Sequence, residues 1–171
     1  LRGKTIGIDA TTLEANAALR SIVRRDTGEG YTQFLEGLAQ DSGLETPTRQ
    51  DLVKLDRKRP KKGSNKDWTH PHDPDAQITK MKAGGTHLAH KAEQAVDLSG
   101  AGAVLAVTLH GGAQGDTSSI HDTVQAAEEN LQTLHEDPET AQRVHAAPVQ
   151  EVVADKGYHS NDMLVALQDD G

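Results

Sequence analysis

The stretch KTIGIDATTL, residues 4–13, decides the fold class. Ile6 and Ile8 alternate with small or polar residues, and a period of two is typical of a β-strand. The same alternation puts Asp9 on the face opposite the two isoleucines. The sequence therefore predicts a strand that carries one carboxylate on its polar face.

A second aspartate stands at a matching place near the other end of the chain. VQEVVAD, residues 149–155, is a short apolar strand pattern that ends in Asp155 and is followed by Lys156 and Gly157. Sites in α/β sheets gather at the carboxyl ends of strands, and a glycine after such an aspartate lets the backbone turn sharply. If the two strands are neighbours, Asp9 and Asp155 lie close together.

Two adjacent carboxylates repel each other unless a cation or a proton neutralises them. Mg²⁺ prefers carboxylate oxygens, and it typically takes one or two of them together with substrate phosphates. Paired metal ions stabilise the attacking and leaving oxygens in phosphodiester chemistry. The pair therefore indicates Mg²⁺-dependent chemistry on nucleic acid, although each aspartate alone is also typical of an ordinary turn.

The elements between the two aspartates indicate a mixed α/β domain. For residues 14–85 the sequence predicts helices over 14–25, over 31–40 and from Thr46-Pro47 toward Pro60, and then an exposed polar loop over 63–85. The second half predicts a strand over 87–97, a turn at SGAG and an apolar strand over 103–109, buried on both faces, which form a hairpin. A loop whose Asp116, Thr117 or Ser118 caps a helix follows, then an amphipathic helix with Ile120, Val124, Ala127, Leu131 and Leu134 on one stripe, and a last helix capped by Ser160.

Composition excludes several classes of protein. The 171 residues contain no cysteine, so disulfides and thiolate metal sites are excluded, and no apolar run approaches the roughly 20 residues needed to span a bilayer. The net charge of -8 argues against nucleic acid, but residues 49–66 hold eight Lys and Arg against two Asp. A cytoplasmic protein with a local basic surface, and no membrane partner, is expected.

Three segments together resemble the DDE transposase domain of bacterial insertion sequences. They are GIDATTLEANAALRSIVRRDTGE, HLAHKAEQAVD and VVADKGYHS, and the resemblance spans residues 4–167. It implies a ribonuclease-H-like mixed sheet flanked by helices, with a helical and basic-loop insert over about 14–85 after the first strand. It also implies DNA partners, namely transposon ends and target DNA, a nucleoid-associated location on DNA and a homodimer in the full complex.

The family's chemistry uses three acids and two Mg²⁺ or Mn²⁺ ions for DNA strand cleavage and strand transfer. By resemblance, Asp9 matches the first acid and Asp155 the second. The third is a Glu on a downstream helix, and no Glu follows Glu151. We therefore expect a catalytic core that is incomplete at its C-terminus, poorly soluble alone and unable to cleave or join transposon ends.

Basic and aromatic residues near these motifs are candidates for further roles. Lys and Arg in an exposed run release condensed counterions when they bind phosphates. His159 is expected near the site or the DNA backbone, and Tyr158 either resembles the family's tyrosine or packs beneath the turn. The DNA-contacting candidates are Arg57, Lys58, Arg59, Lys61, Lys62, Lys91, Lys156 and His159.

Two other functions stay open on the sequence alone. A non-catalytic DNA-binding or regulatory product derived from a transposase would bind DNA even without both aspartates. A small metal-dependent hydrolase would need a histidine within ligand distance of Asp9 and Asp155, which the strand geometry does not favour.

Overall fold

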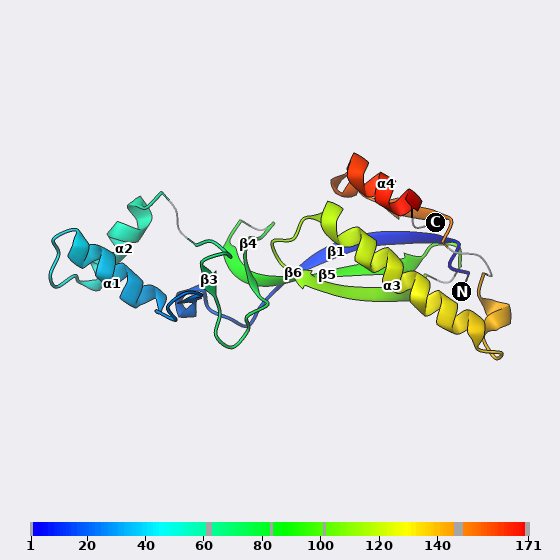
Figure 1. The fold of residues 1–171 in the computed structure, drawn as a ribbon, viewed down its shortest axis with the longest axis horizontal. Helices are drawn as coiled ribbons and strands as arrows, with labels where there is room; N and C mark the ends of the chain where they lie inside the picture. Colours follow the sequence, from blue (N-terminus) through cyan, green and yellow to red (C-terminus); the bar gives the residue numbers. More distant parts are fainter. Residues whose placement is uncertain (1, 61–62, 83, 101, 146–148, 170–171) are drawn as a thin grey trace. The chain divides into compact units, whose positions relative to one another are not determined.

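The computed structural model describes residues 2–60, 63–82, 84–100, 102–145 and 149–169 (Figure 1). The chain forms two compact units. Unit 1 comprises Leu1–Leu13, Lys91–His110 and Gln114–Gly171, and unit 2 comprises Glu14–His90 and Gly111–Ala113. No helix in the described segments is long and apolar enough to cross a membrane.

The sheet of unit 1 is mixed. β1 (Thr5–Glu14) lies between β5 (Thr86–Asp97) and β7 (Glu151–Ala154), and β6 (Val104–Gly111) pairs with β5. β1 and β7 are parallel. β1 and β5 run antiparallel, because the N–H of Leu98 donates to the Thr5 carbonyl at one end while that of Ala15 donates to the Leu88 carbonyl at the other. The strand predictions, the hairpin and the α/β class are confirmed.

One long helix covers the apolar face of this sheet. α3 (Asp116–Glu136) buries the side chains of Ile120, Val124, Ala127 and Leu131. They pack with Ile6, Ile8, Ala95, Leu105 and Ala106 from the strands. The amphipathic stripe is therefore confirmed, but the predicted cap is wrong, since the N-cap of α3 is Gly115, which has no capping side chain.

The C-terminal segment of unit 1 turns back onto the same core. η3 (Lys156–Tyr158) follows β7, and α4 (Asn161–Asp169) comes next. Ser160 caps α4 as predicted, because its Oγ accepts a hydrogen bond from the N–H of Met163 at 3.1 Å. Met163 and Leu167 then pack against the core cluster.

The prediction that β6 is buried on both faces is wrong. Leu105 and Ala106 are buried, but Val104, Val107 and Leu109 are 56%, 57% and 71% exposed. Val153 of β7 is also 47% exposed, on the side of its strand away from the core. In the described part of unit 1, the continuous apolar run of β6 therefore has one face that is exposed to solvent.

Unit 2 contains two helices and short strands. α1 (Tyr31–Asp41) confirms the helix expected over 31–40, and α2 (Arg49–Lys58) packs on it through Leu35, Ala39 and Leu52. α2 begins later than predicted, because the Thr48 hydroxyl accepts a hydrogen bond from the N–H of Asp51 and caps the helix there.

Two predictions in unit 2 are wrong. Residues 14–25 are not a helix: they contain the end of β1, a short 3₁₀ turn η1 (Leu19–Ser21) and β2 (Val23–Arg24). The polar stretch 63–85 is not a simple exposed loop, because it contributes β3 (Trp68–Thr69), paired with β2, and β4 (Gln77–Lys80), paired with β5. Trp68 is only 3% exposed.

The buried carboxylate of Asp97 joins the chain's N-terminal residues to the turn after β5. It accepts hydrogen bonds from the backbone N–H groups of Arg2 at 3.0 Å, Gly3 at 3.2 Å and Ser99 at 3.0 Å. Burial alone would raise the pKa of Asp97, but these three donors leave that pKa below its usual value.

We expect Asp97→Ala to lower the free energy of unfolding by about 2–3 kcal/mol, since it leaves buried donors without an acceptor. A depressed folded-state pKa gives stability that is complete above about pH 4 and is lost as the pH falls further. Urea unfolding at pH 7 and pH 3 measures both effects. An equal difference between wild type and variant at the two pH values would contradict the ionised role.

Candidate metal site on two parallel strands

The structure brings Asp9 and Asp155 to neighbouring strand positions. The parallel register pairs Thr5 with Glu151 and continues to Ile8 and Ala154. Asp9 and Asp155 each follow the last of these partners, and adjacent strands lie about 4.8 Å apart. Asp9 also stands on the side of β1 away from the buried isoleucines, as predicted.

Each of the two carboxylates is oriented by one backbone donor. The Ala10 N–H donates to Asp9 Oδ1 at 2.8 Å, and the Gly157 N–H donates to Asp155 Oδ1 at 2.6 Å. Both aspartates are exposed. Water, a cation or a phosphate-bound ion therefore has access to both carboxylates.

Asp116 brings a third carboxylate to the turn after β7. A Cβ built on Gly157 would lie 2.9 Å from Asp155 Oδ1 and 3.3 Å from Asp116 Oδ2. The absence of a side chain at Gly157 thus leaves room for both carboxylates to approach its backbone. Sequence reasoning named Asp116 only as a helix cap, and no local pattern indicates that the start of α3 reaches this turn.

A buried polar network links this region to the sheet. The Lys91 Nζ lies 2.5 Å from Asp116 Oδ1, 2.7 Å from Ser119 Oγ and 3.3 Å from Glu93 Oε1. Glu93, fully buried, also accepts hydrogen bonds from Ser119 at 2.7 Å and from Thr123 at 2.5 Å. The carboxylate of Glu93 is thus compensated by one ammonium and two hydroxyls.

Tyr158 lies against the same network. It is buried, and the Lys91 Nζ sits 5.7 Å from the centre of its ring. Burial raises the pKa of the Tyr158 hydroxyl, and the negative charges of Glu93, Asp116 and Asp9 raise it further. Of the two roles expected for Tyr158, the structure shows packing beneath the turn.

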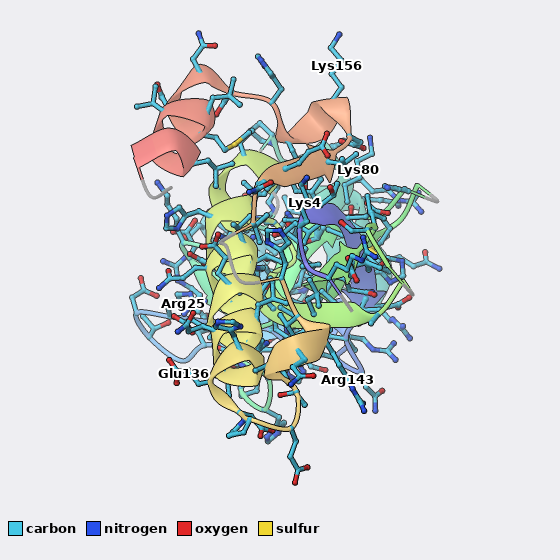
Figure 2. The ribbon with its side chains drawn as sticks, turned by 90° about the vertical axis from the view of Figure 1, so that its right-hand side faces the viewer. Lys4, Arg25, Lys80, Glu136, Arg143 and Lys156 are labelled. Carbon is cyan, nitrogen blue, oxygen red and sulfur yellow. The ribbon has the colours of Figure 1, made fainter. Side chains whose placement is uncertain are left out.

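Lys91, a predicted DNA contact, is buried in this structure and bound to acidic side chains. Lys91 is 4% exposed, and its ammonium is engaged by Asp116, Ser119 and Glu93. Breaking a buried ion pair to reach a phosphate would leave Glu93 uncompensated. Lys156 and His159 by contrast are exposed beside Asp155, and Figure 2 shows the Lys156 side chain extending away from the ribbon.

The basic candidates in unit 2 divide into two kinds. Arg57 and Lys58 are exposed at the end of α2. Arg59 is largely engaged by the fold, since its guanidinium bonds to Asp56 and to the Tyr31 hydroxyl at 3.0 Å and lies over the Phe34 ring. Lys61 and Lys62 lie outside the described residues.

No family model, curated protein or solved structure matches the chain. The interpretation of Asp9 and Asp155 therefore depends on their geometry and on the motifs around them. In the segments that the structure describes, no group of three or more His, Cys, Asp or Glu side chains is arranged to hold a metal ion. The two aspartates suit a hard cation whose other ligands are water or phosphate oxygens.

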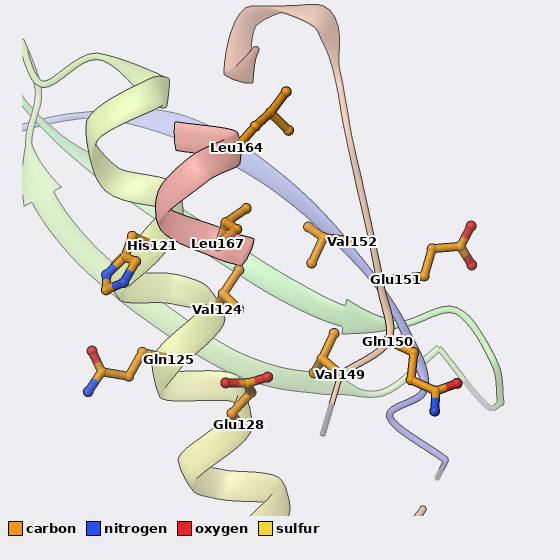
Figure 3. A pocket seen from close by; sticks show the side chains of 10 residues that line it. All are labelled: His121, Val124, Gln125, Glu128, Val149, Gln150, Glu151, Val152, Leu164 and Leu167. Carbon is orange, nitrogen blue, oxygen red and sulfur yellow. The ribbon is translucent and has the colours of Figure 1, made fainter. Parts of the chain in front are cut away.

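A groove of about 560 Å³ in unit 1 lies apart from the two aspartates (Figure 3). Its apolar lining comes from α3, α4 and the strand β7 with the residues before it: Val124, Val149, Val152, Leu164 and Leu167. Polar side chains such as Gln125 and Glu151 stand around it. Neither Asp9 nor Asp155 lines this groove.

Proposed function

We propose that the chain carries catalytic-core residues of a DDE-type transposase, which cuts and joins DNA with Mg²⁺ or Mn²⁺. The observation that carries the proposal is the parallel pairing of β1 and β7, which sets Asp9, within β1, beside Asp155, directly after β7. The bound ion would supply electrostatic stabilisation of phosphate oxygens. Asp9 and Asp155 are its protein ligands.

The topology supports this proposal. β6, β5, β1 and β7 are neighbours in that order, with α3 between β6 and β7 along the chain, and this mixed arrangement is compatible with a ribonuclease-H-like fold. The motifs DATTLEANA and ADKGYHS surround the two aspartates. We propose that these 171 residues bind the ion through Asp9 and Asp155 but do not by themselves complete strand transfer.

Titration of the chain with Mn²⁺, followed by calorimetry, tests the metal site. We expect Asp9→Asn and Asp155→Asn each to weaken Mn²⁺ binding at least about tenfold, equivalent to about 1.4 kcal/mol, because each removes one of two charged ligands. Asp162→Asn is the matched control, since Asp162 is an exposed aspartate of the same unit.

Equal Mn²⁺ affinity in the wild type and in both site variants would reject the metal site. Far-UV circular dichroism of each variant separates loss of the ligand from loss of the fold. Robust strand transfer by the 171 residues would reject the proposal that these residues alone do not complete the reaction.

A second candidate function is DNA binding without catalysis. The exposed cations of α2 favour it, because they lie in unit 2 whereas Asp9 and Asp155 belong to unit 1. Duplex affinity in the Asp9→Asn/Asp155→Asn double variant separates the two functions. Unchanged affinity together with no metal binding by the wild type would favour this second function.

A further inference from the structure

The outer face of α2 carries three exposed cations. An open groove of about 280 Å³ on this face, the α2 groove, is lined by Arg49, Gln50, Val53, Lys54 and Arg57. All five side chains are exposed. Helical spacing puts them on one half of the helix, opposite the buried Leu52 and the half-buried Leu55.

The two acids of α2 are committed to the fold elsewhere on the helix. Asp51 accepts hydrogen bonds from the Thr48 hydroxyl at 2.6 Å and the Thr48 N–H at 3.1 Å. Asp56 accepts one from the Tyr31 hydroxyl at 2.7 Å and forms an ion pair with Arg59 at 3.0 Å. Asp56 is therefore neutralised by Arg59, whereas Asp51 keeps its charge and acts electrostatically on Lys54.

The three cations of the groove have no comparable partners. Among the described residues, no side-chain hydrogen bond or ion pair engages Arg49, Lys54 or Arg57. The charge of the chain is also divided unevenly: residues 14–90 hold 13 Lys and Arg against 11 Asp and Glu, whereas the rest of the chain holds 5 against 15. A polyanion is attracted to the first part and repelled by the second.

We infer that the α2 groove binds the phosphate backbone of duplex DNA through Arg49, Lys54 and Arg57. Arginine and lysine on one rigid helix face contact phosphates without reading base sequence. Gln50 supplies an amide donor at the same face. This role of the α2 groove rests on the proposed function and adds a DNA contact surface to it. Arg49 and Lys54 become phosphate contacts in addition to Arg57 at the end of the helix.

Fluorescence anisotropy with a labelled duplex in EDTA tests the inference without metal. The full chain is compared with the triple variant Arg49→Gln/Lys54→Gln/Arg57→Gln, in which glutamine preserves helix propensity. Each lost phosphate contact lowers the slope of log K against log salt by about 0.9, so the triple variant should lose about 2.7. Its affinity at low salt should fall at least about tenfold.

The matched control is Arg20→Gln/Lys66→Gln/Lys80→Gln, which removes the same charge from exposed positions of the same unit outside the groove. We expect this control to keep its salt slope within about 0.9 of the wild type. Equal losses in both triple variants would overturn the inference, because net charge alone would explain them. Absence of duplex binding by the wild type, or equal displacement by polyglutamate, would overturn it as well.

The outcome is independent of the metal site. A failed α2 groove leaves Mn²⁺ binding by Asp9 and Asp155 unchanged, and a failed metal site leaves the salt slope in EDTA unchanged. Circular dichroism of the triple variant should match the wild type, since none of its three substituted side chains is buried.

Discussion

Lys91→Met is expected to lower the free energy of unfolding by about 3–5 kcal/mol. Removing one partner of a buried ion pair leaves the other charge uncompensated, and Glu93 is fully buried. The ammonium of Lys91 also holds Asp116 and Ser119 through hydrogen bonds of 2.5 and 2.7 Å. Urea unfolding followed by far-UV circular dichroism measures the loss.

Lys156→Met is the matched control, because it makes the same substitution at an exposed position. Its free energy of unfolding should stay within about 0.5 kcal/mol of the wild type. The double variant Lys91→Met/Glu93→Gln should recover part of the loss, with a coupling of about 0.5–3 kcal/mol. A free energy of unfolding for Lys91→Met equal to that of the wild type would contradict the stabilising role of Lys91 in the network.

Trp68→Ala should also destabilise by about 3–5 kcal/mol, in this case within unit 2. Trp68 is 3% exposed and makes edge-on contacts with Tyr31 and Phe34 at ring-centre distances of 5.1 and 5.2 Å. The Arg24 guanidinium lies 5.9 Å from its ring centre. Alanine would open a cavity beside Tyr31 and Phe34, whose ring contacts with Trp68 hold β3 and α1 together.

Hydrogen exchange read by mass spectrometry localises this effect. Peptides from α1 and β3 should exchange faster in Trp68→Ala, whereas peptides from α3 should keep their protection. Trp68→Phe is the control, since a smaller aromatic ring retains part of the packing and should cost less than alanine. Equal protection of α1 in the wild type and in Trp68→Ala would contradict the assignment of Trp68 to this core.

The elements that were predicted well have a periodicity visible within a few residues. β1 alternates, and α3 carries its apolar stripe at helical spacing, so each pattern survives whatever surrounds it. The two-residue strands β2 and β3 have no such pattern. They depend on contacts distant in sequence, such as the Arg25 N–H to the Asp67 carbonyl at 2.9 Å and the Arg25 side chain to the Asn65 carbonyl at 3.0 Å.

The candidate site shows the same division. Asp9 and Asp155 were predictable because Asp9 lies within, and Asp155 directly after, a recognisable strand pattern. Asp116 was not, because its approach to Gly157 depends on how α3 packs. The burial of Lys91 was not predictable, because β5 is buried along most of its length and alternation does not reveal which charged residues face inward.

The hydrogen bond of 2.8 Å from the Ala15 N–H to the Leu88 carbonyl has a consequence for how the chain is assembled. It joins the two ends of the segment between β1 and β5, so the polypeptide leaves and returns at one place. Segments whose ends meet are tolerated as insertions into a host domain. Residues 16–87, most of unit 2, are thus a segment that gene rearrangement could gain, exchange or lose, with a short β-turn joining β1 to the rest of β5 in its place.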